Sequence, residues 1–485
     1  MASRLKYTSV TKSLCTLLTA IIIGLSSNMI LVPARAELPT LGDPTQQSFS
    51  PFNEYLMGKQ FYMTLRANVP FIEDLEVDDY VNTLGQRLVS HTDHVDRDFK
   101  FFVIDINSIN AFAGPDAYLG FHSGLILAAK NESEFAGVMA HEISHVTQRH
   151  LARALTESST NPATMFATIL AGILLASQNP DAGAALIYGG QAALMQSQIN
   201  FTRSNEHEAD RIGIRILQEA GIDPEGMASF FETLLKNTDS NNLLSQMEYL
   251  RTHPLNSTRV AEARNRISEQ SRALRHDSLD FQLMRSRILL KTQKDPAQLV
   301  NQLADHGEAG IVNDYTLGLA YTANRQFDKA IEKLAKLSQV EDHPWIKLAL
   351  ADAYLAANQT EQNLKLLQQL NALYPNYLPV SIRYARALID NQQAKQAILL
   401  LNQQLKSQKK AVVYQILARA YFIENNIALA LEATSHEYQQ EGYLKQAVQQ
   451  IENALQQSDL APLTRQRLES RKQDLMLQIR KESRI

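Results

Sequence analysis

Cysteine is almost absent from this chain of 485 residues. The single cysteine, Cys15, lies near the amino terminus, so the chain cannot form an intramolecular disulfide. Structural zinc sites are fully ligated by protein, usually with cysteine thiolates, so the sequence argues against a site of that kind. A buried core must hold the fold instead, and the chain is long enough to build one.

A large excess of charge of either sign is also missing. The sequence carries 47 Lys and Arg residues against 51 Asp and Glu residues, a formal net charge of −4. Removal of residues 1–36 as a leader would leave 43 basic residues and a net charge of −8. A mildly acidic protein has no general attraction for nucleic acid or anionic lipid, so we expect no nucleic-acid partner.

Apolar runs long enough to span a membrane are lacking as well. The run Leu17–Leu25 is too short for a span, which needs about 20 apolar residues. It lies between basic residues and Ala34-Arg35-Ala36, the order typical of a secretory leader with its cleavage site. We predict cleavage after Ala36, which would remove Cys15 and, in a bacterial-type chain, place the mature protein in the periplasm.

A second apolar stretch covers residues 165–195 and is divided by Asn179-Pro180. Each arm has about a dozen residues, short of the ~20 that a transmembrane helix needs. We predict a helical hairpin packed near the active site, and peripheral contact with a membrane surface stays open.

The most informative motif is His141-Glu142-Ile143-Ser144-His145, which reads H-E-x-x-H. Residues four apart on a helix lie on one face with Cβ atoms about 6 Å apart, so both imidazoles can bind one metal ion. Glu142 can then reach the attacking water as a general base. Asn131 and Glu134 have the spacing of a helix N-cap and its capping-box partner. We predict one Zn²⁺ per chain, with His141 and His145 as ligands and Glu142 as the catalytic base.

A third metal ligand has to come from elsewhere. The metzincin pattern needs a Gly and a further His just downstream, where this chain has Gln148 and Leu151. His150 is nine residues after His141, and about 900° of helical rotation would place it on the opposite face. We therefore expect the two-histidine, one-glutamate set of catalytic zinc sites, completed from a second helix.

Residues 204–220 supply the carboxylate. Glu206 and Asp210 are four apart and share a helix face. We expect Glu206 to bind zinc and Asp210, one turn deeper, to accept the free ring N–H of a ligating histidine. We expect Ser204 to cap this helix, Gly221 to end it and Asp223-Pro224 to begin the next.

These motifs resemble those of the M48 family of zinc metallopeptidases over residues 50–265. The resemblance rests on H-E-x-x-H, on the later E-x-x-A-D, and on three further stretches: Asn110–Pro115 through His122–Leu125, Arg203-Ser204, and Thr252-His253-Pro254 through Arg259-Val260. It implies a zincin-type α+β domain with a small sheet. It also implies that His141, His145 and Glu206 are ligands, Glu142 is the base, and Asp210 contacts a ligand and is sometimes assigned as the proton donor.

The resemblance also places a substrate-binding edge strand at Asn110, Ala111 and Phe112, beside which an extended chain would add as a further strand. Gly114–Ala117 departs from the family's Pro-Gly-Gly-type turn, which leaves the shape of this edge open. His253 precedes a proline and so has an extended or turn conformation. It could serve as a fourth ligand, as an oxyanion stabiliser or as a structural loop residue, whereas we expect the side chains of residues 207–208 to be packing or surface groups.

The carboxy-terminal half contains a repeat. Hydrophobic positions recur at intervals of 33, 33, 34 and 33 residues, at Ile288, Tyr321, Tyr354, Leu388 and Tyr421. Small residues follow nine positions later except at Asn363, and Pro375 lies at an expected inter-repeat turn. The pattern resembles the tetratricopeptide repeat rather than a generic helical bundle, and predicts a superhelix with a concave binding surface.

Together these features predict a mostly α-helical protein with three segments: a leader over 1–36, a zincin-type domain over 37–270 and a tetratricopeptide superhelix over 278–485. This layout resembles that of periplasmic M48 proteases. The resemblance implies a zinc endopeptidase in quality control of outer-membrane β-barrel proteins, with unfolded or misassembled barrel proteins and the β-barrel assembly machinery as partners. The alternative is a chaperone or adaptor with a latent zinc site; membrane-lipid processing has only residues 165–195 in its favour.

Overall fold

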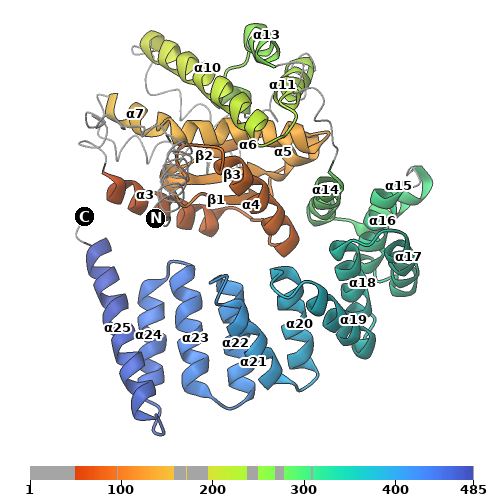
Figure 1. Ribbon diagram of the computed structural model, residues 1–485, viewed down its shortest axis with the longest axis vertical. Helices are drawn as coiled ribbons and strands as arrows, with labels where there is room; N and C mark the ends of the chain where they lie inside the picture. Colours follow the sequence, from red (N-terminus) through yellow and green to blue (C-terminus); the bar gives the residue numbers. More distant parts are fainter. Residues whose placement is uncertain are drawn as a thin grey trace, which may run out of the picture. The chain divides into compact units, whose positions relative to one another are not determined.

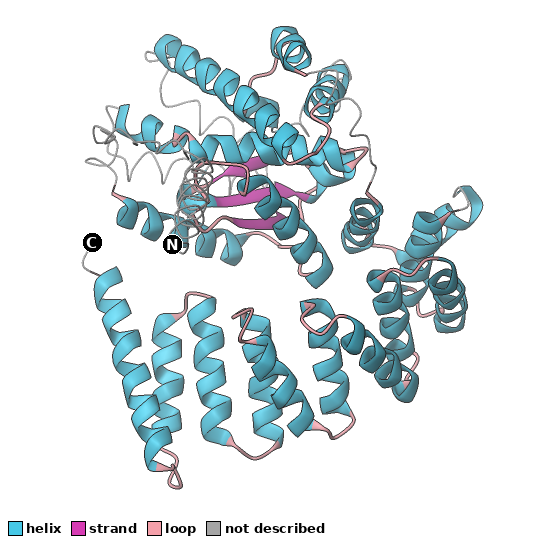
Figure 2. Ribbon diagram, viewed as in Figure 1, coloured by secondary structure: helices cyan, strands magenta, loops and turns pink. Residues whose placement is uncertain are grey.

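The computed structural model describes residues 50–95, 97–157, 171, 195–237, 249–267, 278–306 and 310–483. The predicted leader lies outside these residues, and so does the predicted hairpin over 165–195, apart from residues 171 and 195. Within this part the chain is mostly helical with one small sheet, which confirms the predicted fold class (Figure 2).

The sheet has three strands, β1 (Lys100–Ile104), β2 (Ala111–Ala113) and β3 (Tyr118–His122). Their order is β1-β3-β2, with β3 parallel to β1 and antiparallel to β2. The short connection between β2 and β3 is a 3₁₀ turn, η1 (Pro115–Ala117). Among the described residues β2 pairs with β3 alone, so it is an edge strand of this sheet; Asn110, the first residue of the expected substrate edge, directly precedes it.

The helices of the amino-terminal half either flank the sheet or pack beside the helices that do (Figure 1). They are α3 (Pro51–Asn68), α4 (Leu75–Val89), α5 (Ser123–Ala128), α6 (Glu132–Thr147), α7 (His150–Glu157), α10 (Met195–Glu219), α11 (Glu225–Asn237), α12 (Tyr249–Thr252) and α13 (Ser257–Arg266). The amide N–H of Glu134 donates to the Asn131 side chain at 2.9 Å, so α6 begins at the predicted cap. The Glu134 carboxylate bonds the N–H of Lys130 at 2.8 Å, one residue before the cap.

One predicted cap is wrong. Ser204 lies inside α10, which begins at Met195, so it cannot cap that helix. The other end agrees with the prediction, because Gly221 follows α10 in the left-handed conformation with φ +68°. The N–H of Glu225 then donates to the Asp223 side chain at 3.0 Å where α11 begins.

Paired helices make up the carboxy-terminal half, and α20 to α25 stand in a row (Figure 1). The bounds are α14 (Leu279–Thr292), α15 (Pro296–His306), α16 (Ile311–Ala323), α17 (Phe327–Val340), α18 (Pro344–Ala356), α19 (Thr360–Leu373), α20 (Leu378–Asp390), α21 (Ala394–Gln404), α22 (Ala411–Ile423), α23 (Ile427–Gln440), α24 (Leu444–Leu455) and α25 (Pro462–Glu482).

The repeat positions of the sequence have one structural role. The carbonyls of Tyr321, Tyr354, Leu388 and Tyr421 each accept the backbone N–H five residues later, at 2.8–2.9 Å. This bond closes the turn between the two helices of each pair, so the sequence period is the period of the helical pairs. Asn363, which breaks the small-residue pattern, is buried and donates its amide to the Ala351 carbonyl at 2.7 Å.

The repeat helices pack directly on the amino-terminal half. Phe281 of α14 stacks on Phe135 of α6 with ring centroids 6.1 Å apart. The Arg287 guanidinium in α14 bonds both carboxylate oxygens of Asp74 at 2.8 Å. At the far end of the array, Lys59 of α3 contacts Glu482 of α25 at 2.8 Å. The first and last helices of the array therefore both contact the amino-terminal half.

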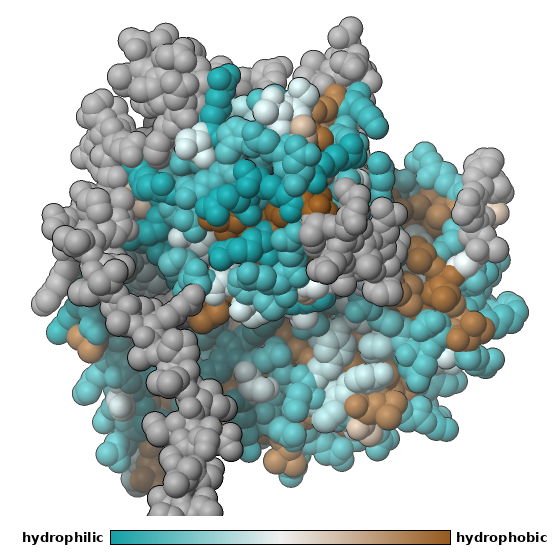
Figure 3. Space-filling view, turned by 45° about the horizontal axis from the view of Figure 1, so that its top comes forward, coloured by the Kyte–Doolittle hydropathy of each residue, from teal (hydrophilic) through white to brown (hydrophobic). Residues whose placement is uncertain are grey.

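Within the part of the chain that the structure describes, no helix has both the length and the apolar character needed to cross a bilayer. The face shown in Figure 3 is mainly hydrophilic over the upper half, with apolar side chains in separate patches.

Candidate metal centre and catalytic residues

The helix α6 places His141 and His145 one turn apart, with their Nε2 atoms 3.0 Å from each other. The helix α10 comes close enough to bring a carboxylate to them. A Cβ atom added to Gly213 of α10 would lie 3.3 Å from the backbone nitrogen of His141, which is tighter than ordinary contact. Glycine at this position therefore permits the close approach of the two helices.

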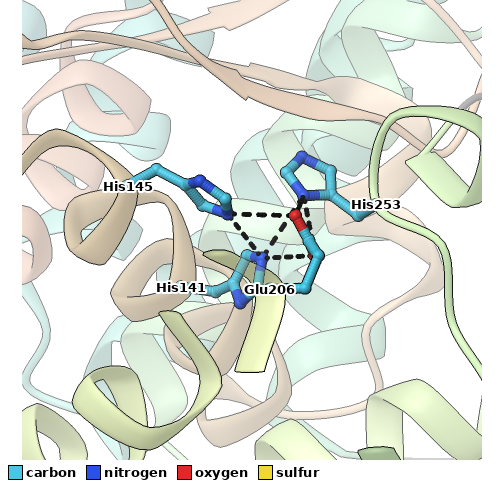
Figure 4. A group of neighbouring side chains, drawn as sticks. All are labelled: His141, His145, Glu206 and His253. Carbon is cyan, nitrogen blue, oxygen red and sulfur yellow. Dashed lines mark hydrogen bonds and ion pairs between the residues drawn. The ribbon is translucent and has the colours of Figure 1, made fainter. Parts of the chain in front are cut away.

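Glu206 of α10 completes a compact group of donors. Its Oε2 atom lies 3.3 Å from His141 Nε2, and its Oε1 atom lies 3.4 Å from His145 Nε2. His253 follows α12 and points into the same group, with Nδ1 3.1 Å from Glu206 Oε1 and 3.3 Å from His141 Nε2 (Figure 4). The structure thus brings together the three predicted ligands and the fourth candidate.

The spacing of these atoms fits a zinc ion. Four ligands bound at about 2.0–2.1 Å around a tetrahedral zinc ion lie about 3.3 Å from one another. The contacts of 3.0 to 3.4 Å among His141, His145, Glu206 and His253 agree with that edge length. The group is also deeply buried, since His145 has the most exposed side chain at 13%.

Asp210 and Arg259 lie behind the donors. His141 Nδ1 lies 3.0 Å from Asp210 Oδ1, as the sequence predicted for Asp210. Arg259 of α13 donates to both oxygens of Asp210 at 2.7 and 2.8 Å and contacts Glu206 at 2.9 Å. Arg259 belongs to a predicted motif, but we assigned it no role from the sequence, because nothing in that motif indicates its partner.

The electrostatics of the group keep its carboxylates ionised. Burial opposes ionisation, but the charge of His253 and hydrogen bonds from His141 and His253 hold the pKa of Glu206 well below its usual range. Burial likewise opposes ionisation of Asp210, and hydrogen bonds from His141 and Arg259 lower its pKa. Burial opposes protonation of His141, yet the two carboxylates raise its pKa to about 9. Metal binding at this histidine would therefore release a proton.

Glu142 lies on α6 beside the donors and is 1% exposed. Among the described residues neither of its carboxylate oxygens has a hydrogen-bond partner, although His253 Nε2 lies 3.4 Å from Oε1. Burial raises the pKa of Glu142. A buried carboxylate without a donor is costly for the fold, which is a frequent sign of a functional group.

His150 does not lie on the far face of α6, where continuous helical rotation would have placed it. The helix α6 ends at Thr147, and Arg149 has a left-handed backbone with φ 53°, so the chain turns before α7 begins. The His150 Nδ1 atom then lies 2.8 Å from His145 Nδ1. His150 is outside the group of donor atoms, as predicted, but it contacts one of the candidate ligands.

Two neighbours of Glu206 are ion-paired. His207 contacts Glu262 at 3.0 Å with over a third of its side chain exposed, which is a surface role. Glu208 lies 3.1 Å from His150 Nε2 and 3.0 Å from Arg153 Nη2. Burial lowers the pKa of His150 to about 4. We expected Glu208 to be a packing or surface group. Its contact with His150 depends on the turn at Arg149, which the sequence does not indicate.

The predicted substrate-edge residues lie on or directly before a strand that packs against α6, and they differ in exposure. Asn110 and Ala111 are buried, whereas Phe112 is half-buried. The turn that follows keeps left-handed backbone at Asp116 (φ 55°) and Ala117 (φ 58°), the conformation that glycine favours. This turn therefore holds two non-glycine residues in a backbone conformation that glycine adopts most readily.

Comparison with known proteins agrees with this geometry. Residues 76–267 match the model of peptidase family M48. The chain is 34% identical to the Beta-barrel assembly-enhancing protease of Escherichia coli (strain K12), over 94% of both chains. It is 34% identical to the protein of the same name from Yersinia pestis over 77% of both chains. It is also 30% identical to the Mitochondrial metalloendopeptidase OMA1 of Arabidopsis thaliana, over 32% of this chain and 29% of that protein.

The match to the E. coli protein runs through both the peptidase part and the repeat helices, since it covers nearly the whole of each chain. The site described above lies inside the residues that match the peptidase family. This chain is therefore a metallopeptidase of family M48 and belongs to the family of the beta-barrel assembly-enhancing proteases.

Proposed function

We propose that this protein is a periplasmic zinc-dependent endopeptidase that hydrolyses peptide bonds of unfolded or misassembled outer-membrane β-barrel proteins. Its peptidase family and the name of its relatives support the reaction class and the substrate class. In this proposal residues 1–36 are a leader, residues 37–270 form the catalytic domain and residues 278–485 form the repeat domain.

The observation that carries the proposal is the position of Glu142 beside the donor group. Two histidines and a glutamate are the donor set of catalytic zinc sites, in which a fourth position stays open for water or substrate. A carboxylate adjacent to that position, buried and without a hydrogen-bond donor, is placed to accept a proton. A structural zinc site would have no use for such a group.

The proposed mechanism assigns a task to each residue. His141, His145 and Glu206 would hold the zinc ion, which when bound polarises the scissile carbonyl and lowers the pKa of a water. Glu142 takes the proton of the attacking water and gives it to the leaving amine. Asp210 lies 3.0 Å from His141 Nδ1 and would leave Nε2 to bind the metal, so its catalytic task is to position this ligand.

The edge strand β2 would align the substrate. An extended chain can add to a sheet edge by main-chain hydrogen bonds, whatever its side chains are. That mode suits unfolded clients, whose backbone is available. The burial of Asn110 and Ala111 anchors this strand in the fold, so the edge is held in place for such pairing.

The repeat array would choose partners. Arrays of this kind present an extended concave surface, and the name of the relatives points to the β-barrel assembly machinery as the partner. Peripheral contact with a membrane surface is a further part of the proposal that rests on residues 165–195 alone.

A second candidate function is a chaperone or adaptor with a latent zinc site. The burial of the donor group and the position of His253 favour it, because His253 as a fourth ligand would close the coordination that catalysis needs open. Replacement of His253 by Ala separates its two roles: hydrolysis rises if His253 closes the site, and falls if it stabilises the oxyanion.

The experiment uses residues 37–485 and measures zinc content and casein hydrolysis together. One zinc per chain, with hydrolysis abolished by a chelator and by Glu142→Gln, would support the peptidase. Glu262→Gln is the matched control, because Glu262 contacts His207 rather than the donor group. Zinc without hydrolysis, with barrel assembly in cells retained by Glu142→Gln, would favour the chaperone. Absence of zinc from the folded protein would overturn both.

A further inference from the structure

The turn at Arg149 brings a second histidine against a candidate ligand. His150 is 5% exposed and its Nδ1 atom lies 2.8 Å from Nδ1 of His145. On the other side of its ring, Nε2 lies 3.1 Å from Glu208 Oε2. Glu208 is in turn bonded by Arg153 at 3.0 Å. A chain of hydrogen-bonding groups therefore runs from Arg153 through Glu208 and His150 to His145, and we call this chain the His150 relay.

The direction of the hydrogen bonds follows from what each group can donate. The Glu208 carboxylate only accepts, so His150 donates its Nε2–H to it. A neutral imidazole has a single N–H, so His150 Nδ1 is a lone pair and accepts from His145 Nδ1–H. His145 is then left with a lone pair on Nε2, the atom that faces His141 and Glu206.

The same result is reached for the other candidate ligand by a shorter route. His141 Nδ1 lies 3.0 Å from Asp210, and Arg259 holds Asp210. Each candidate ligand histidine is thus backed by a carboxylate that an arginine holds in place. For His145 one imidazole, that of His150, is inserted between the ligand and the carboxylate.

We propose that His150, oriented by Glu208, is a positioning residue that fixes the tautomer and ring orientation of His145 for metal binding. This inference rests on the proposed function, in which His145 is a zinc ligand. Partners of this kind fix the free nitrogen of a ligating histidine, and their loss typically costs 10- to 100-fold in metal affinity.

A purely structural role predicts something different. If His150 only joins α7 to α6, an apolar residue of similar size would keep metal affinity. If it positions His145, a residue that retains an acceptor at the place of Nδ1 would keep affinity, and an apolar one would lose it. Asparagine offers such an acceptor through its side-chain oxygen, and leucine does not.

The test is zinc affinity of residues 37–485, measured by competition with a chromophoric chelator, for wild type, His150→Leu and His150→Asn. We expect a 10- to 100-fold loss for His150→Leu and recovery to within about threefold for His150→Asn. The cobalt-substituted protein should show an altered d–d absorption spectrum only in His150→Leu. His207→Leu is the matched control, because that histidine also pairs with a glutamate but lies outside the relay.

The outcomes separate this inference from the proposed function. Equal zinc affinities of wild type and His150→Leu would refute the positioning role of His150 without contradicting the proposed zinc site. Zinc binding without hydrolysis would overturn the peptidase and leave the relay to be decided by the affinities. If His150→Leu does not fold, Glu208→Leu removes the acceptor of the same relay, and an unchanged zinc affinity in that variant overturns the inference.

Discussion

Arg259 should stabilise the fold far more than an exposed arginine of the same helix. It is 2% exposed, donates to both oxygens of Asp210 at 2.7 and 2.8 Å and contacts Glu206 at 2.9 Å. Replacing it with Met would leave two buried carboxylates without their cation. Removing one partner of a buried ion pair costs about 3–5 kcal/mol, and we expect Arg259→Met to fall in that range.

Arg264 provides the matched control, because it is also in α13 and also contacts two carboxylates, Glu225 at 3.2 Å and Glu232 at 2.7 Å. Its side chain is 47% exposed, so solvent screens these pairs and Arg264→Met should cost at most about 1 kcal/mol. The two variants thus differ mainly in burial.

The measurement is urea unfolding in the presence of a chelator, followed by far-ultraviolet circular dichroism and by fluorescence of Trp345, the single tryptophan. Adding Asp210→Asn to Arg259→Met tests the pair directly, and the coupling energy should be about 2–3 kcal/mol. The reasoning would be refuted if Arg259→Met lowered the unfolding free energy no more than Arg264→Met does. It would also be refuted if the losses of Arg259→Met and Asp210→Asn were strictly additive in the double variant.

Two further predictions concern other parts of the molecule. Burial lowers the pKa of His122 to about 3, so its neutral form supports the fold above pH 6.5, and this support is lost as the pH falls toward 3. The unfolding free energy of His122→Gln, measured relative to wild type in urea, should rise by about 2 kcal/mol between pH 7.5 and pH 5, and a constant difference would contradict this. Gln392 has left-handed backbone with φ 59°, so Gln392→Gly should stabilise the protein by about 1 kcal/mol. Gln396→Gly, inside α21, should destabilise it by a similar amount. Changes of the same sign in the unfolding free energies of the two variants, measured in urea, would contradict this.

Regular periodicity made much of this protein predictable. Helix geometry fixes the position of His145 relative to His141, and of Asp210 relative to Glu206, because the two residues of each pair are four apart on one continuous helix. The repeat period was predictable for the same reason, since each copy ends its first helix with the same turn. Asn131 was predictable as a cap because its side chain is suited to one task at a helix start.

Contacts that depend on a local break or on distant segments could not be predicted. The turn at Arg149 has neither glycine nor proline to mark it, so nothing in the sequence shows that His150 returns to His145. The Ser204 cap was wrong because a good cap residue is also tolerated inside a helix. The pairing of Arg287 with Asp74 joins residues 213 positions apart, and no local pattern specifies such a partner.

The contacts at both ends of the array change how it can deform. A free solenoid is a one-dimensional stack that unravels from its terminal repeats, where each unit has a single neighbour. Here Arg287 in the first helix is bound to Asp74, and Glu482 in the last is bound to Lys59, so both terminal helices have a neighbour outside the stack. A partner that changes the curvature of the superhelix would therefore have one of two effects. It would break the ion pair between Lys59 and Glu482, or it would pull on α3 and α4. In the proposed function, deformation of the array by a bound partner would therefore reach the helices that flank the sheet.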